Sequence, residues 1–357
     1  MRVAFVTVGD TSRMTGGYLY NARVMDGLRE RGVRVEEIVA SSASPEEQRT
    51  AARRGDALDP TDFDVVVVDA LARIAVAPHL DRWRMECPVV AMVHELPSIA
   101  GGESGAEAAA REREYEEPLL RSDLFIAVSD HGRRLLEIQG VPHPRVYIVP
   151  PGFDRLPAPA EPVDNLDGTV RALCVAQWIP RKGILTLVEA WTRRERPGAA
   201  LELIGETDAD PEYTAQVRET IAAAPDSSLV VSGTVDDAEL MRSYAAADLF
   251  ALPSRYEGYG VVYAEALSFG LPVVACEVGP VPELVGRDAA VLVPPDDPVA
   301  LAEALDLLLE DPDLRRRMSG AARRRAERLP RWEDTVSGFE TALRAAVRDG
   351  ARRTGAR

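Results

Sequence analysis

The sequence is poor in several residue types and patterns, and each shortage excludes a class of protein. Its three cysteines, Cys87, Cys174 and Cys276, stand singly in apolar runs, without the paired spacing of a disulfide framework or a zinc site. No apolar run approaches the roughly 18 residues of a membrane span. The net charge of -16 leaves no broad basic surface for nucleic acid. We therefore expect a cytoplasmic protein without a stable membrane anchor, although the arginine-rich residues 313–357 could touch a membrane surface weakly.

Lysine is almost absent, and its one occurrence is informative. Lys182 is the only lysine among the 42 Lys and Arg residues, and it stands beside Gly183 at the end of an expected strand. A composition that uses arginine everywhere else indicates that a compact positive charge is wanted at this position, as for binding a phosphate. Chance retention of a surface lysine is the alternative.

What the sequence has in abundance is short β-branched runs separated by helical stretches. Continuous apolar strands that alternate with helices predict buried parallel sheets, and hence an α/β fold. Both halves of the chain show this pattern. The runs are RVAFVTVG, DVVVVDA, PVVAMVH and DLFIAVS in the first half, and RALCVAQ, LELIG, SLVVSG, DLFALPS, LPVVAC and AAVLVPP in the second.

A proline-rich stretch divides the two halves. Residues 149–168, VPPGFDRLPAPAEPVDNLDG, carry five prolines and two glycines, which interrupt regular structure as an interdomain linker does. We expect a first domain over residues 1–155 and a second over residues 166–332. The apolar spacing of residues 333–350 predicts a helix that could pack back on the first domain.

Polar and glycine residues follow many of the expected strands. In a parallel α/β sheet, ligands collect beyond the carboxyl ends of the strands, so these positions are candidates for a binding site. They are Gly16 and Gly17 after the first strand, His94 after PVVAMV, Gln177 to Lys182 after RALCVA, Gly205 after LELI, and Glu257 after DLFALPS.

One carboxylate stands in an otherwise apolar helix. In RYEGYGVVYAEALSFGLPVVA, residues 255–275, Glu265 has no opposite charge within reach along the helix. Burying an unpaired carboxylate costs several kcal/mol, so Glu265 must be hydrogen-bonded, protonated or facing a polar ligand. A narrow solvent-exposed edge or a bond to the backbone are the alternatives.

A second carboxylate precedes the same helix. Glu257 is followed by Gly258 and Gly260, which allow close backbone approach and leave amide groups free at the positive end of the helix. Carboxylates accept hydrogen bonds from neighbouring hydroxyls, and amides donate to phosphate. The pattern therefore fits a ligand that carries both, such as a nucleotide sugar.

The sequence resembles the retaining glycosyltransferases of glycosyltransferase family four, which have two Rossmann-like domains in the GT-B arrangement. The resemblance rests on PRKG, LELIGE, VVSGTVDDAELMRSYAAADLFALPSRYEGYGVVYAEALSFGLPVVACEVGPVPELV and VLVPPDD. It is strong over about residues 170–300. VSDHGRRLLEIQGVPHPRVYIVPPGFD also matches, whereas the first 90 residues match loosely.

The resemblance implies a role for each matching position. Glu265 would accept from ribose hydroxyls, Glu257 would touch the donor sugar, and Lys182 would neutralise the diphosphate. His94 would lie near the transferred sugar, with a satisfied core histidine as the alternative. The implied catalytic residues are His94, Glu257 and Lys182, and the implied donor-binding residues are Gly16, Gly17, Gln177, Arg181, Lys182, Gly205, Val235, Glu257, Gly258, Tyr259, Gly260, Val261, Val262 and Glu265.

One position departs from the family pattern. The family usually has arginine five residues before the lysine, where this chain has Gln177. Either Arg181 or another arginine compensates, or the leaving group is held more weakly. The acceptor would be bound by the first domain, whose sequence matches the family too loosely to identify the acceptor.

The expected reaction is transfer of a hexosyl unit from a nucleoside diphosphate sugar to a hydroxyl acceptor, with retention implied by the resemblance alone. No metal or other cofactor is expected, because the D-x-D patterns at Asp62, Asp64, Asp208 and Asp210 are common by chance in an acidic chain. A nucleotide-sugar epimerase and a non-catalytic nucleotide-sugar-binding module are the alternatives. We expect a monomer or homodimer.

Overall fold

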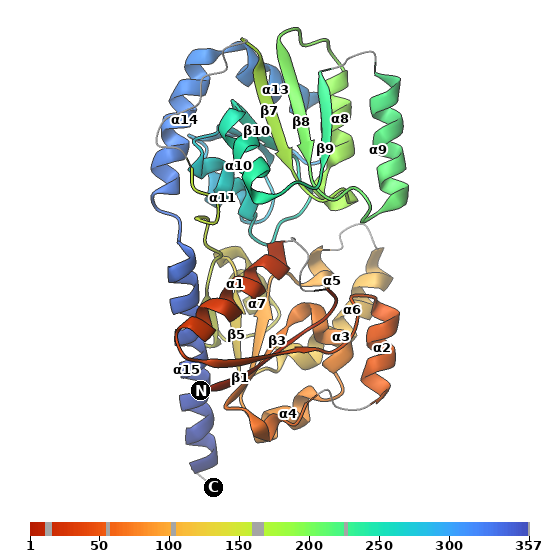
Figure 1. Cartoon of the computed structure of the whole chain (residues 1–357). Helices are drawn as coiled ribbons and strands as arrows, with labels where there is room; N and C mark the ends of the chain where they lie inside the picture. The colour runs from red at the N-terminus through yellow and green to blue at the C-terminus, as the bar shows by residue number, and fades with distance from the viewer. Residues whose placement is uncertain (11–15, 55–57, 101–104, 159–167, 225–227, 356–357) are drawn as a thin grey trace. The chain divides into compact units, whose positions relative to one another are not determined.

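The computed structural model describes residues 1–10, 16–54, 58–100, 105–158, 168–224 and 228–355, and it divides into two compact units. The N-unit comprises Met1–Gly152 together with Pro330–Arg357, and the C-unit comprises Phe153–Leu329. Each unit has its own six-stranded sheet with helices around it (Figure 1). The α/β fold class is confirmed. Residues 159–167 of the expected linker lie outside the described residues.

The sheet of the N-unit has the strand order β2-β1-β3-β4-β5-β6, and all its neighbours pair in parallel. The residues of β3, β4 and β5 are buried throughout, because helices cover both faces of the sheet. The strands are β1 (Arg2–Thr7), β2 (Arg34–Val39), β3 (Val65–Asp69), β4 (Val89–Val93), β5 (Leu124–Ala127) and β6 (Val146–Ile148).

Helices cover the two faces of this sheet in separate groups (Figure 1). Trp83 of α4 and Leu119 of α6 share a core with one face, and Phe339 of α15 stacks on Phe5 of β1 at the other. The helices are α1 (Gly16–Glu30), α2 (Pro45–Arg54), α3 (Arg73–Val76), α4 (Leu80–Glu86), α5 (Pro97–Ala100), α6 (Gly105–Leu120), α7 (Asp130–Ile138) and α15 (Trp332–Gly355), with 3-10 turns η1 (Pro60–Asp62), η2 (Ala70–Ala72) and η3 (His143–Arg145).

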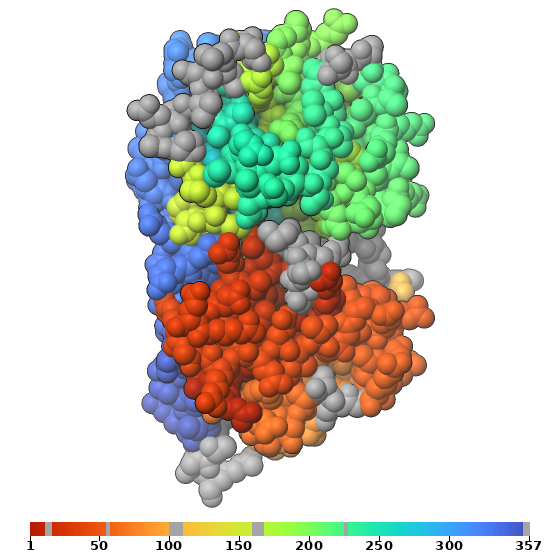
Figure 2. Space-filling view, in the orientation of Figure 1, coloured from red at the N-terminus to blue at the C-terminus, as the bar shows by residue number. Residues whose placement is uncertain are grey.

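Helix α15 returns to the N-unit from the end of the chain. Figures 1 and 2 show it in blue beside the red first helix and its neighbours. Gly27 of α1 allows the close approach, because a Cβ there would lie 2.5 Å from Cγ2 of Val336. Arg31 also donates to Glu340 at 3.2 Å and pairs with Glu333. The last helix therefore completes the core of the N-unit.

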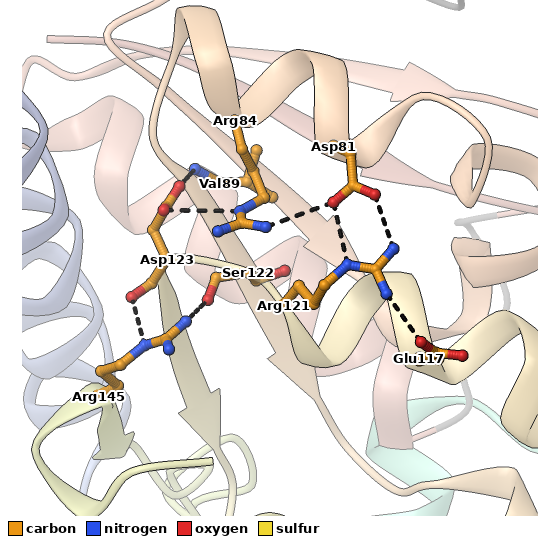
Figure 3. Close-up of polar contacts among 8 residues, drawn as sticks. All are labelled: Asp81, Arg84, Val89, Glu117, Arg121, Ser122, Asp123 and Arg145. Carbon is orange, nitrogen blue, oxygen red and sulfur yellow. Dashed lines mark hydrogen bonds and ion pairs between the residues drawn. The ribbon is translucent and has the colours of Figure 1, made fainter. Parts of the chain in front are cut away.

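An ion-pair network ties the amino-terminal edge of this sheet together (Figure 3). Asp123, just before β5, accepts from the amide of Val89 at 2.8 Å and lies 3.6 Å from Nε of Arg84. Arg121 binds both carboxylate oxygens of Asp81, at 3.1 and 2.7 Å, and Arg84 reaches the same carboxylate at 3.4 Å. These contacts join α4, α6 and β5 at the edge opposite to the one where His94 follows β4.

The sheet of the C-unit has the order β12-β11-β10-β7-β8-β9, in which all neighbours again pair in parallel. The chain winds outward from β7 in one direction and from β10 in the other, so these two central strands flank a topological switch point. The strands are β7 (Val170–Val175), β8 (Ala199–Ile204), β9 (Leu229–Gly233), β10 (Leu249–Leu252), β11 (Val273–Cys276) and β12 (Ala290–Val293).

The helices of the C-unit pack on both faces of its sheet, with α8, α9 and α13 together on one face and α11 against α14 on the other (Figure 1). The core holds Trp178, Trp191, Tyr244 and Tyr263, all fully buried. The helices are α8 (Ile184–Thr192), α9 (Pro211–Ala223), α10 (Asp237–Ala246), α11 (Val261–Ser268), α12 (Val281–Val285), α13 (Pro298–Glu310) and α14 (Pro312–Ala326), with the 3-10 turn η4 (Pro180–Lys182).

The three cysteines are free thiols in these cores. Burial raises the pKa of each to about 12, so they remain protonated and act as small apolar residues. Within the described residues, no helix has the length and apolar character needed to cross a bilayer.

Candidate functional site

The loops that follow β7 and β10 meet at the switch point of the C-unit. The amide of Arg255 donates to the carbonyl of Arg181 at 2.8 Å. Gly183 has a φ of +67°, and a Cβ there would lie 2.2 Å from the carbonyl oxygen of Pro253, so only glycine fits this contact. The backbone of one loop is therefore fixed directly against the other.

This contact brings together the two residues that the sequence singled out by separate arguments. Nζ of Lys182 donates to Oε1 of Glu257 at 2.7 Å, and Oγ of Ser254 donates to the same oxygen at 2.7 Å. Glu257 is only 4% exposed. Burial by itself raises the pKa of the Glu257 carboxyl, but the charges of Lys182 and Arg181 and the hydrogen bonds from Lys182 and Ser254 together outweigh burial, and the pKa lies below its usual value. The Glu257 carboxyl is therefore ionised.

Helix α11 begins beside this pair without a side-chain cap. Gly260 occupies the cap position with a φ of +99° and makes no side-chain cap bond to the first amides. A Cβ at Gly260 would lie 2.5 Å from the ring of Tyr263. The positive end of α11 is therefore open to an anion. The expected donor-binding residues Gly258, Tyr259, Val261 and Val262 line this turn and are half-buried.

Glu265 is hydrogen-bonded, which is one of the possibilities left open by the sequence, and its opposite charge comes from outside its own helix. Nε and Nη2 of Arg155 donate to Oε1 of Glu265 at 3.1 and 3.0 Å, and the hydroxyl of Tyr244 donates to Oε2 at 3.2 Å. Glu265 is 2% exposed. Burial raises its pKa above the usual value, and Arg155 and Tyr244 offset only part of the rise. Arg155 lies 110 positions earlier in the chain, so helical spacing could not reveal it.

The remaining candidates of the C-unit lie in neighbouring loops. Nε2 of Gln177 donates to Glu206 at 2.6 Å, so the amide that replaces the family's arginine contacts a carboxylate. Gly205 allows the loop after β8 to approach the loop after β7, because a Cβ at Gly205 would lie 1.9 Å from the carbonyl oxygen of Ala176. Val235 follows β9 and packs against the core. Glu206 was missed, although it directly follows the expected strand LELI and Gly205.

Arg181, the candidate substitute for the missing cation, points to the same loop as Lys182. Its Nη1 donates to the main-chain carbonyl of Tyr256 at 3.4 Å. Its charge helps to lower the pKa of Glu257. Whether it also reaches a ligand stays a prediction.

In the N-unit, His94 belongs to a chain of polar residues beside the carboxyl ends of β3 and β4, in which Asn21 and Asp69 are buried and the His94 side chain is 16% exposed. Nε2 of His94 lies 3.1 Å from Oδ1 of Asn21, and Nδ2 of Asn21 donates to Oδ2 of Asp69 at 2.5 Å. Because the Asn21 amide nitrogen faces the carboxylate, its oxygen accepts the hydrogen from Nε2 of His94. Burial lowers the pKa of His94 despite the nearby charges of Asp69 and Glu95, which favours a neutral ring.

Sequence reasoning missed two members of this chain for different reasons. Asp69 is the last residue of the buried strand β3, so it lies at the edge of the sheet that pointed to His94. Asn21 stands in an amphipathic helix, where a polar residue normally faces solvent, and nothing in its spacing marks it as buried. The contact with His94 exists only in the folded N-unit.

Gly16 and Gly17, the candidates after the first strand, lie in a helix and not in a loop. They are the first two residues of α1. A Cβ on Gly17 would lie 3.7 Å from Cδ2 of His94, so this helix start lies against the imidazole ring. Met14 and Thr15, which precede them, lie outside the described residues.

The D-x-D patterns contribute to local structure. Asp210 caps α9 by accepting from the amide of Tyr213 at 3.0 Å, and Asp64 accepts from the amide of Arg2 at 2.7 Å. Among the residues that the structure describes, no group of three or more His, Cys, Asp or Glu is arranged to hold a metal ion.

Two surface recesses in the described parts of the chain lie away from these constellations. One, of about 510 Å³, is lined by residues such as Arg2, Arg34 and Phe63, at the amino ends of β1 and β2. The other, of about 130 Å³, includes Arg171 and Ala200 at the starts of β7 and β8. Ligands of parallel sheets collect at the opposite edge, so the polar constellations are the better guide to the site.

Family models match both halves of the chain. The model described as "Glycosyl transferases group 1" matches residues 162–325, and the model "Glycosyltransferase Family 4" matches residues 16–155. A D-inositol 3-phosphate glycosyltransferase of Kineococcus radiotolerans is 31% identical over 308 residues, which are 77% of this chain and 70% of the relative.

Two solved structures share the fold. The sucrose-phosphate synthase of Thermosynechococcus elongatus gives a TM-score of 0.79 at 21% identity, covering 96% of this chain and 98% of that one. Anabaena Alr3699/HepE in complex with UDP and glucose gives 0.76 at 17% identity, covering 97% and 100%. These likenesses show the GT-B fold. The expected enzyme class is confirmed by the family models and by the relative from Kineococcus radiotolerans. The chain belongs to glycosyltransferase family 4 and is a glycosyltransferase.

Proposed function

We propose that this glycosyltransferase transfers a hexosyl unit from a nucleoside diphosphate sugar to a hydroxyl acceptor, with retention at the anomeric carbon and without a divalent metal. The observation that carries the proposal is the Lys182–Glu257 ion pair beside the start of α11, which has no side-chain cap. A cation and a positive helix end suit a diphosphate, and a buried carboxylate suits sugar hydroxyls. The bound UDP and glucose named for the Anabaena relative agree with such a donor.

The step to be catalysed is a separation of charge. The bond from the anomeric carbon to the β-phosphate oxygen breaks, and its electron pair stays with the phosphate. The acceptor oxygen forms the new bond to that carbon, and its proton passes to the leaving phosphate. Lys182 and the amides of α11 would stabilise the growing negative charge on the diphosphate. No protein nucleophile is needed in this scheme.

Lys182 can serve the diphosphate without giving up Glu257. An ammonium group has three N–H donors, and one of them is used in the bond to Oε1 of Glu257. The other two remain for phosphate oxygens. Because Lys182 and Ser254 both donate to Oε1, we expect a hydroxyl of the donor sugar to reach Oε2 of Glu257.

His94 would take a hydrogen bond from a substrate hydroxyl. Its Nε2–H is directed to Asn21, so Nδ1 of the neutral ring is the nitrogen that can accept. Gly17 lies against the ring without a side chain that would compete for it.

A thermal-shift screen tests the donor assignment. UDP, GDP and ADP and their hexose derivatives are each added with Mg²⁺ or with EDTA, since a ligand of the folded state stabilises it by mass action. The proposal expects one nucleoside series to raise Tm equally in both conditions. Stabilisation by none of them would contradict the donor class, and stabilisation only with Mg²⁺ would contradict the metal-free scheme.

A further inference from the structure

Arg155 is a buried charged residue in the segment that opens the C-unit. Its side chain is only 6% exposed. Nε and Nη2 both donate to Oε1 of Glu265, and Nη1 donates to Asp237. Burial by itself lowers the pKa of Arg155, but the two carboxylates outweigh burial and raise it, so the guanidinium stays charged.

The guanidinium joins two helices from outside both. Asp237 is the first residue of α10, and Glu265 lies inside α11. The planar guanidinium has five N–H donors in a fixed fork, so it can bind two carboxylates at once. A lysine ammonium has no such fork. The position of the Glu265 carboxylate therefore depends on Arg155 as well as on its own helix.

The carboxylate keeps acceptor capacity after these bonds are made. An ionised carboxylate has about four lone-pair sites. Arg155 uses both sites of Oε1, and Tyr244 uses one site of Oε2. The remaining site is on Oε2, which is the oxygen that the guanidinium leaves open. Both the charge and the direction of this site are set by Arg155 and Tyr244.

We propose that Arg155 is a positioning residue for nucleotide recognition, which keeps Glu265 ionised and turns its Oε2 toward a ribose hydroxyl of the nucleoside diphosphate. This inference rests on the proposed function, which assigns the nucleotide to the C-unit. Arg155 itself does not touch the ligand. Its effect on the ligand passes through Glu265.

Loss of Arg155 would leave a buried carboxylate that takes up a proton. Asp237 remains nearby and disfavours a second negative charge, while Tyr244 alone supports the ionised form. A protonated carboxyl has lost acceptor capacity, so ribose binding weakens as the pH falls. Among the titratable or charged groups on elements next to α11, Cys276 of β11 is a neutral thiol and Glu283 of α12 is exposed. On α14, Arg323 donates to the carbonyl of Phe269 and Arg325 to the carbonyl of Leu284.

The test compares two probes over a range of pH. Binding of UDP, GDP and ADP is measured by calorimetry for wild type, Arg155→Met and Arg155→Lys, with inorganic pyrophosphate as the probe that lacks ribose. For Arg155→Met, we expect nucleoside diphosphate affinity to fall about tenfold or more near pH 6 and to recover toward pH 8.5. Pyrophosphate affinity stays unchanged. Arg155→Lys keeps a charge, so it restores part of the affinity and flattens the pH profile.

A matched control separates this role from a purely structural one. Arg196 is equally buried in the C-unit and pairs with Asp306 of α13 at 2.8 Å. Arg196→Met should lower Tm and leave the affinities and their pH profile unchanged. In Arg155→Met/Glu265→Gln the pH dependence should disappear, because no carboxylate is left to titrate.

The outcomes distinguish this inference from the proposed function. If wild type binds none of the three nucleoside diphosphates, the proposed function falls and the role of Arg155 falls with it. Suppose instead that wild type binds one of them. If Arg155→Met then shows the same affinity and pH profile as wild type, or loses as much affinity for pyrophosphate as for the nucleoside diphosphate, only the role of Arg155 is overturned. Should Arg155→Met fail to fold, Arg155→Lys decides. Weaker binding of the nucleoside diphosphate with unchanged binding of pyrophosphate supports the role, and unchanged affinity for both ligands overturns it.

Discussion

At the residue scale, the two glutamates of the C-unit differ in how firmly they are ionised. Each has a cation, Lys182 for Glu257 and Arg155 for Glu265. The pKa of Glu257 lies below its usual value and that of Glu265 lies above it, because burial outweighs the partner only at Glu265. Two carboxylates eight positions apart therefore differ in their chemistry. Glu257 is a fixed charge, whereas Glu265 depends on its neighbours.

His94 offers a residue-scale prediction in the N-unit. Its pKa is lowered by burial, so the folded ring stays neutral at a pH where the unfolded ring takes up a proton. The unfolded state then binds more protons, and the stability that His94 contributes is lost as the pH falls below about 6.5. We expect the free energy of unfolding to fall less between about pH 7 and pH 5 for His94→Gln than for wild type. Equal pH dependence in urea titrations of the two proteins would contradict the lowered pKa.

At the scale of elements, the position rule for parallel sheets predicted part of the site. It selected Lys182, Glu257 and His94 because each follows an expected strand. It could not select Arg155 or Asn21, since one lies in a proline-rich segment and the other in a helix. Their importance comes from contacts between elements that are distant in the chain.

The strands that sequence reasoning missed are β2 and β6, and both lie at edges of the N-unit sheet. An edge strand is not buried on both faces, so it need not carry the continuous apolar run that marks an inner strand, although the edge strands β9 and β12 do. Strand β2, RVEEIV, alternates between exposed and half-buried residues, and β6 has only three residues. Every inner strand of both sheets was predicted, because burial on two faces leaves a clear signature.

Gly205 provides the prediction at this scale. Gly205 has a φ of +142°, and a Cβ at this position would lie only 1.9 Å from the carbonyl oxygen of Ala176. Any other residue at position 205 would therefore force the backbone to shift. We expect Gly205→Ala to lower the free energy of unfolding by about 3 kcal/mol, from strain and overpacking together. Gly198→Ala is the control, because Gly198 also has a positive φ but faces open space. If denaturant titrations show that both variants lose the same free energy of unfolding, the close approach of Gly205 to Ala176 does not matter for stability.

At the scale of the whole molecule, the chain ends in the unit where it began. Phe339 of α15 is fully buried and stacks on Phe5 of β1, with ring centroids 6.2 Å apart. The sequence predicted a helix near residues 333–350 from its apolar spacing alone. The contact that assigns the helix to the N-unit depends on Gly27, whose role is visible only when α1 and α15 are seen together.

Phe339→Ala tests this assignment. Removing a buried aromatic side chain typically costs about 3–5 kcal/mol, and here the loss should fall on the N-unit. Two units need not unfold together, so we expect an earlier transition in urea for N-unit probes and an unchanged one for C-unit probes. Leu307→Ala, at a half-exposed position of α13, is the control and should move neither transition appreciably. A shift confined to the C-unit transition would contradict the assignment of α15.

The account as a whole depends on Lys182 as the cation that meets a diphosphate at the switch point of the C-unit. The most direct measurement is the nucleoside diphosphate affinity of Lys182→Ala by calorimetry, with the exposed Arg316→Ala of α14 as control and the unfolding transition of each variant recorded in parallel. We predict that Lys182→Ala weakens binding by about 1.5–3 kcal/mol, the usual value of a charged hydrogen bond, while Arg316→Ala binds like wild type. A folded Lys182→Ala that binds as tightly as wild type would contradict the account.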